Sequence, residues 1–141
     1  MDKDERFIFL IGQARHRLFN SLDKSLMDTA GVTAAQSGAL YYLMDNDGCL
    51  LSALSKALKL DKSAITGLVD RLEKKGLASR RTTSNDRRAI NIYLTEAGLS
   101  AAKACLEVTR EYNNAIKEGL SKEEIESFSR VLQKIINRFS Q

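Results

Sequence analysis

The feature that most constrains this 141-residue chain is a change of hydrophobic period near its middle. On both sides of that point, apolar residues recur at three- and four-residue steps, which is the period of a helix. In between, Ile90, Ile92 and Leu94 alternate with more polar neighbours, which is the two-residue period of a strand. The pattern therefore predicts a mostly α fold with a minor β part, classed as α+β.

Capping residues and glycines set the expected bounds of the helices. Capping boxes opened by Thr33 and Ser121 begin two of them. Ser52 is expected to cap a short helix whose apolar residues, Ala57 among them, face inward. Glycines follow several expected ends, and the absence of proline suits long unbroken helices. The expected helices, caps included, cover residues 4–28, 33–46, 52–58, 62–75, 95–118 and 121–139.

The extended segments predict a β-hairpin. Residues 77–83 and 89–94 are its strands, and the polar segment 84–88 is its tip. Residues 49–51 are compatible with a further brief strand. The order of short helix, turn, helix and hairpin is that of a winged helix-turn-helix. The expected parts are an N-terminal helix, a winged helix-turn-helix lobe and C-terminal helices within one interdependent domain, over residues 1–32, 33–98 and 99–141.

Composition excludes several classes of protein. With 43% hydrophobic and 28% charged residues, the chain is a globular protein rather than a disordered one. No apolar run reaches the ~20 residues of a membrane span, and the charged N-terminus is unlike a signal peptide, so a cytoplasmic location is expected. One histidine, with Cys49 and Cys105 far apart, offers no zinc site and little material for a catalytic triad. We expect no metal, no cofactor and no enzyme activity.

The net charge of +4 is unevenly distributed along the chain. Residues 1–55 carry −2, residues 56–88 carry +6, and residues 89–141 are neutral. A basic segment of this kind suits nucleic acid, although a solvated charged face would explain the count equally well.

The helix expected at residues 62–75 has the pattern of a DNA-recognition helix. Its apolar residues form one stripe that must pack inward, and its opposite face is small and polar, which suits hydrogen bonds to base edges in the major groove. Gly67 costs ~1 kcal/mol relative to alanine in a helix, which favours close approach of another body, although packing against a second helix would also explain it. The residues of this polar face are Lys62, Ser63, Thr66, Gly67 and Asp70.

The hairpin tip carries Asp86, Arg87 and Arg88. Arginine is long and permanently charged, which suits the negative potential of a narrow minor groove. A neighbouring aspartate can fix its direction through a paired hydrogen bond. A solvated polar turn is the alternative for an isolated hairpin, but the position directly after a recognition-type helix favours DNA.

Two segments resemble the MarR family of bacterial transcription regulators. Residues 86–98, DRRAINIYLTEAG, are similar to the family's wing signature of Asp-x-Arg, an aliphatic residue, x and Leu-Thr-x-x-Gly. Residues 70–77, DRLEKKGL, resemble its passage from the recognition helix into the wing. Length and helix order also agree, so the resemblance covers essentially the whole chain. It is specific to the family and not to a ligand or an operator.

The resemblance implies a homodimer that binds a pseudo-palindromic, double-stranded DNA operator and usually represses transcription. It implies that the polar helix face enters the major groove, and that Arg88 enters the minor groove with Asp86 orienting it. It further implies phosphate or support contacts for Arg71, Arg80, Arg81 and Arg87.

The resemblance also implies a small aromatic ligand, held between the dimer helices and the DNA-binding lobe in many relatives. Packing alone would explain each of the candidate residues here, and the cysteine of the peroxide-sensing relatives is missing from the first helix. The candidates are Arg15, His16, Phe19, Tyr41 and Tyr42.

The terminal helices carry more apolar surface than one small lobe covers, which predicts a dimer. Intramolecular packing of these helices is the alternative, and a protein-binding winged helix is the alternative function. The predicted dimer residues are Phe7, Leu10, Ile125, Phe128, Leu132, Ile135 and Phe139.

Overall fold

The computed structural model describes residues 2–82 and 89–140, apart from the side chain of residue 4. The chain forms two compact units, Met1–Thr109 and Arg110–Gln141, and helix α5 runs across the boundary between them. The expected three-part division remains a prediction. The elements in order are η1 (Lys3–Glu5), α1 (Phe7–Ala30), α2 (Ala34–Asp45), β1 (Cys49–Leu50), α3 (Leu51–Leu58), α4 (Lys62–Lys74), β2 (Ala78–Thr82), β3 (Ile90–Leu94), α5 (Glu96–Lys117) and α6 (Lys122–Arg138).

The mostly helical fold with a small sheet is as predicted, and so are the capping boxes. At the start of α2, the Thr33 hydroxyl accepts from the Gln36 amide and the Gln36 side chain accepts from the Thr33 amide, both at 3.2 Å. Ser121 and Glu124 make the same exchange at the start of α6. Gly31 ends α1 with a φ of 67°, a left-handed conformation that glycine adopts without strain.

Three details at helix ends differ from the prediction. A 3-10 turn covers Lys3–Glu5, so the first α-helix begins only at Phe7. Phe139 is the C-cap of α6 rather than part of it. Ser52 lies exposed inside the first turn of α3 and does not cap it.

The prediction for Ser52 was wrong because of a tertiary contact. Leu50 pairs with Asn91 in the sheet, so the strand ends where the helix begins and Leu50 itself takes the N-cap position without a side-chain hydrogen bond. The inward position expected for Ala57 was also wrong, because α3 buries Leu54 and turns Ala57 to solvent.

The sheet is antiparallel with strand order β1-β3-β2, so the brief strand compatible with residues 49–51 is present. Ile92 on the central strand lies opposite both Cys49 and Arg80 and is fully buried. The predicted tip residues Asp86, Arg87 and Arg88 lie outside the described residues.

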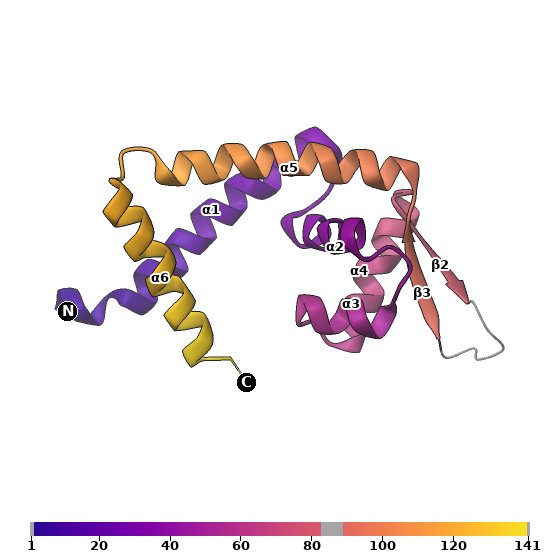
Figure 1. Ribbon diagram of the computed structural model, residues 1–141, viewed down its shortest axis with the longest axis horizontal. Coiled ribbons are helices and arrows are strands. Elements are labelled where there is room, and N and C mark those ends of the chain that lie inside the picture. Colours follow the sequence, from indigo (N-terminus) through magenta and orange to yellow (C-terminus); the bar gives the residue numbers. More distant parts are fainter. Residues whose placement is uncertain (1, 83–88, 141) are drawn as a thin grey trace. The chain divides into compact units, whose positions relative to one another are not determined.

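Helices α2, α3 and α4 pack together beside the β2–β3 hairpin (Figure 1). The core of the unit Met1–Thr109 is mostly aliphatic. Burying each large aliphatic side chain contributes roughly 1.5–3 kcal/mol to the free energy of folding. The fully buried large side chains of this core include Leu26, Val32, Leu40, Leu43, Leu54, Ile65, Val69, Leu72, Ile92 and Cys105.

The junction between the hairpin and α5 requires a glycine at position 98. The Thr95 hydroxyl accepts from the Gly98 amide at 2.9 Å and donates to the Gly76 carbonyl at 2.7 Å, which closes the start of α5 onto the start of the hairpin. A Cβ atom at Gly98 would lie 2.0 Å from the Leu77 carbonyl oxygen. Only glycine therefore allows this approach.

We expect Gly98→Ala to lower the free energy of unfolding by about 2–3 kcal/mol, because the added methyl group overpacks against backbone that cannot move aside. Urea unfolding followed by circular dichroism at fixed protein concentration measures this. Gly38→Ala in α2 is the matched control, since its Cβ would lie 3.8 Å from Leu58, an ordinary contact. Equal unfolding midpoints for the two variants would contradict the assignment.

Candidate nucleic-acid interface

Helix α4 buries one face and presents the other. The carboxylate of Asp61 accepts from the Ala64 amide at 2.7 Å and caps the helix. Ile65, Leu68, Val69 and Leu72 are all buried, at no more than 5% exposure. Opposite them lies the polar face of α4, in which Lys62 and Ser63 are exposed and Thr66, Gly67 and Asp70 are half-buried.

The hydrogen bonds of Thr66 limit what it can offer a ligand. Its hydroxyl donates to the Lys62 carbonyl at 2.7 Å, one turn earlier in the helix. The oxygen keeps acceptor capacity, and the methyl group is apolar. Thr66 is therefore suited to accept a hydrogen bond from a base amino group or to contact a thymine methyl group.

Gly67 is not explained by packing within the described part of the chain. The nearest atom that a Cβ there would meet is Nη1 of Arg71, at 3.5 Å, which is an ordinary contact with a flexible side chain. A second helix packing on Gly67, which the sequence left open, is therefore not its reason within this part of the chain. The glycine leaves room on the exposed face next to the Arg71 guanidinium.

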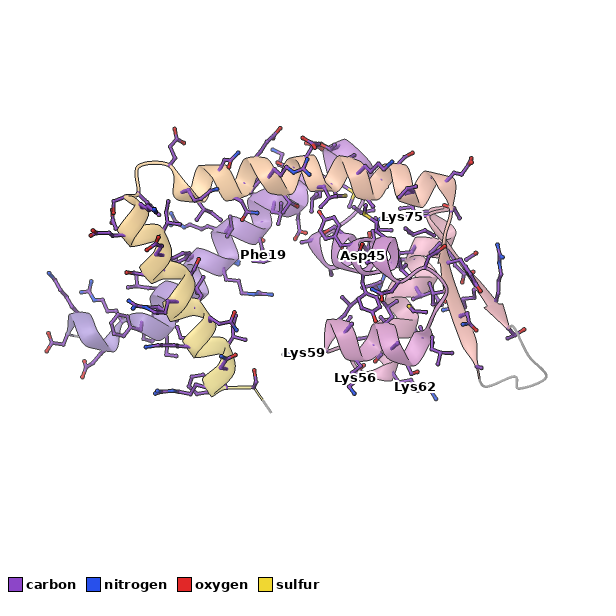
Figure 2. The ribbon with its side chains drawn as sticks, in the orientation of Figure 1. Phe19, Asp45, Lys56, Lys59, Lys62 and Lys75 are labelled. Carbon is purple, nitrogen blue, oxygen red and sulfur yellow. The ribbon has the colours of Figure 1, made fainter. Side chains whose placement is uncertain are left out.

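Three lysines surround the turn between α3 and α4, at one end of the lobe (Figure 2). Lys56 lies in the last turn of α3, Lys59 is its C-cap, and Lys62 begins α4. Lys59 has a φ of 54°, a left-handed conformation that costs a non-glycine residue about 1–2 kcal/mol. Lys56 and Lys59 were absent from the predicted site, although their places on either side of the helix-turn-helix turn could have indicated them.

Two other basic side chains of the central segment, Lys75 and Arg81, make contacts with neighbouring elements. The Lys75 ammonium donates to the Gly31 carbonyl at 2.6 Å and to Oε1 of Gln36 at 2.8 Å, so it ties the end of α4 to the connection between α1 and α2. The Arg81 guanidinium lies 4.6 Å from the centre of the Tyr93 ring, a cation–π contact across the hairpin.

Arg80 is the most constrained of the basic side chains. Its Nη2 lies 2.5 Å from Oδ1 of Asp70 and donates to the Thr66 carbonyl at 3.2 Å. Its Nη1 lies 3.0 Å from Oε1 of Glu73, and its backbone amide donates to the other oxygen of that carboxylate at 3.3 Å. Arg80 thus joins strand β2 to helix α4.

The predicted effector residues fall into two groups in the structure. On α1, the Arg15 guanidinium lies 5.2 Å from the centre of the Phe19 ring, and the His16 ring lies 3.2 Å from the Asn20 amide. On α2, the Tyr41 and Thr109 hydroxyls are 2.8 Å apart, which links α2 to α5, and Tyr42 is half-buried. Their role as an effector site remains a prediction.

The two thiols are poorly suited to redox chemistry. Burial raises the pKa of the Cys105 thiol, and burial is also the largest cause of the raised pKa of Cys49, to which the Asp47 carboxylate adds. A raised thiol pKa lowers the fraction of reactive thiolate at neutral pH. The structure therefore favours unreactive thiols at both positions.

Within residues 2–82 and 89–140, no group of three or more His, Cys, Asp or Glu side chains could hold a metal ion. No helix in the same residues is both long and apolar enough to cross a membrane.

The segment that contains α2, α3, α4 and the hairpin is similar to known proteins. The family model described as "MarR family" matches residues 30–89. A putative transcriptional regulatory protein for the hcr operon of Thauera aromatica is 36% identical over 83 residues, 59% of this chain. That match spans half the length of the Thauera protein.

Two further matches extend over nearly the whole chain. The multiple antibiotic resistance protein MarR of Escherichia coli is 26% identical over 132 residues, which are 93% of this chain and 89% of that protein. The structure of MepR of Staphylococcus aureus in complex with DNA superposes with a TM-score of 0.84 at 25% identity, over 99% of this chain and 100% of that one. Proteins of this family are regulators rather than enzymes. The chain is therefore similar to the MarR family of transcription regulators, whose family model matches residues 30–89.

Proposed function

We propose that this chain is a homodimeric repressor that binds a pseudo-palindromic DNA operator. The observation that carries the proposal is the polar face of α4, which includes a helical glycine that no neighbouring element of the described chain requires. A helix glycine costs stability, so its use on an exposed face favours the close approach of a partner. The DNA complex of MepR, a protein of similar fold, supports DNA as that partner.

The polar face of α4 fits the edges of bases in the major groove. The exposed Ser63 hydroxyl donates and accepts hydrogen bonds, and Thr66 accepts them, while Lys62 brings positive charge to the N-terminal end of the helix. In helix-turn-helix proteins, the residues at the N-terminal end of the recognition helix contact the bases. Gly67 lets the duplex come close to the helix backbone.

The surrounding cations fit the phosphate backbone. Lys56 and Lys59 flank the turn that precedes α4, and Arg71 and Arg81 lie on α4 and on the first wing strand. Such contacts fix the position of a protein on the duplex without reading sequence. The wing residues Asp86, Arg87 and Arg88 are proposed, from the sequence, to reach the adjacent minor groove.

Exposed apolar surface on each unit supports the dimer. Phe7 is 61% exposed at the start of α1, and Phe128 is 50% exposed on α6. Exposed apolar faces of this kind are typical of interfaces between chains. We propose that both faces are buried between two copies, together with Leu10, Ile125, Leu132, Ile135 and Phe139 of the predicted set. A two-fold dimer would then place its two α4 helices about 34 Å apart, one turn of B-DNA.

Repression and the cytoplasmic location remain predictions within this proposal. So does release by a small aromatic effector, whose predicted site is Arg15, His16, Phe19, Tyr41 and Tyr42.

The proposal is tested by fluorescence anisotropy of the purified protein with labelled duplexes at several salt concentrations. We expect saturable binding to a duplex selected by the protein from a random library, with affinity that falls steeply as salt rises, because bound phosphates release counterions. A random duplex of the same length should bind at least about 1,000-fold more weakly. Failure to select any duplex, with no salt-dependent binding, would favour the protein-binding alternative.

Gly67→Ala tests the observation that carries the proposal. We expect it to raise the free energy of unfolding by up to about 1 kcal/mol through helix propensity, and to weaken binding of the selected duplex at least about tenfold through the added methyl group. Gly38→Ala, also a glycine in a helix, is the control that should leave DNA affinity unchanged. Unaltered DNA affinity of the Gly67 variant would remove the main support for the polar face of α4.

Phe128→Asp tests the dimer. A carboxylate buried in an apolar interface is costly, so we expect the dissociation constant of the dimer to rise at least about 100-fold in sedimentation experiments. Ser127→Asp adds the same charge at the exposed neighbouring residue and serves as the control. Deletion of residues 120–141 removes α6 and should also abolish the dimer. If both changed chains still sediment as wild-type dimers, α6 is not the interface.

A further inference from the structure

We propose that Asp70, Glu73 and Arg80 form a clamp that sets the direction of the wing relative to the recognition helix, and that Arg80 is a positioning residue rather than a phosphate contact. The sequence left its role open between phosphate and support. The clamp deepens the proposed function and rests on it, because its purpose is to hold two DNA-binding elements in one geometry.

The guanidinium of Arg80 is occupied from several sides. A terminal guanidinium nitrogen carries two protons, and those of Nη2 are accounted for by Asp70 and by the Thr66 carbonyl. Nη1 is paired with Glu73, whose second oxygen accepts from the Arg80 backbone amide. Only 28% of the Arg80 side chain is exposed. Three of its five N–H donors are thus directed to groups of the protein itself, which leaves fewer for a phosphate.

The charge of the clamp also argues against a phosphate contact for Arg80. Two carboxylates face one guanidinium, so the three side chains together carry a net charge of −1. A cluster of this sign does not attract phosphate, and without Arg80 its carboxylates would repel the duplex. Arg80 offsets the negative charge of the two carboxylates at the edge of α4. Its contribution to DNA binding is therefore to hold β2 against α4.

The position of Arg80 on the strand makes this geometry consequential. The short connection after α4 already fastens the start of β2, since the Leu77 amide donates to the Leu72 carbonyl at 2.9 Å. Arg80 adds a second fastening point farther along, opposite Ile92 of β3. Two points of attachment define the direction of a strand, and β2 ends at Thr82, immediately before the tip. The clamp therefore sets the direction of β2 as far as Thr82, the last described residue before the predicted tip.

Arg80→Lys is the discriminating variant, because it keeps the charge and loses the planar fork that serves three acceptors. We expect it to weaken binding of the selected duplex about tenfold or more, the scale of one lost specific contact. Binding of the random duplex and its salt dependence should stay within about twofold of wild type, since the number of charges is unchanged.

Substitutions at two other arginines serve as controls for this result. Arg81→Lys, on the neighbouring strand residue proposed to contact phosphate, should change the affinities for both duplexes by the same factor. Arg17→Lys on α1 makes the same chemical change at an exposed residue outside the proposed interface and should alter neither affinity. Circular dichroism of each variant reports whether the fold is kept.

Should Arg80→Lys reduce stability as well, Glu73→Gln provides an independent measurement, because Glu73 lies outside the polar face of α4. Both substitutions break the same contact, so their effects on discrimination between the two duplexes should be far from additive in the double variant. Wild-type discrimination by Arg80→Lys, equal losses on both duplexes, or additive effects would overturn the clamp and leave the proposed function standing. Failure of the wild-type protein to bind any duplex would instead refute the function itself.

Discussion

The burial of one face of α4 is the constraint on which the rest of the lobe formed by α2, α3, α4 and the sheet depends. Ile65, Val69 and Leu72 are buried, and α4 packs on α3 and on strand β2. Because a helix is rigid, fixing this stripe also fixes which residues point outward. The polar face of α4 is thus a consequence of the core, and substitutions can change its chemistry while the packing stays intact.

The fold also separates the basic side chains of the central segment into those bound within the lobe and those left exposed. Residues 56–88 carry ten basic side chains, and the count alone does not distinguish those that face a ligand from those bound within the fold. In the folded lobe, Lys75 is bound to the connection between α1 and α2, and Arg80 is bound to the carboxylates of α4. Lys56, Lys59 and Lys62 lie instead around the exposed turn. Net charge therefore identifies the segment, and only the contacts identify which cations face a ligand.

Local signals in the sequence predicted most of the elements, while tertiary contacts account for the errors. Thr33 and Ser121 could be recognised as caps because capping depends on residues three apart. Ser52 failed as a cap because the pairing of Leu50 with Asn91, far away in sequence, moved the start of the helix. The several partners of Arg80 were invisible for the same reason: Glu73 lies seven residues away, and the contact requires the hairpin to fold back onto α4.

Hydroxyl-radical footprinting of the wild-type protein on its selected duplex tests whether two copies present paired α4 helices and wings to one duplex. We expect two protected backbone segments related by two-fold symmetry, with centres about 10 base pairs apart. A single protected segment, or two segments with no symmetry, would contradict this arrangement.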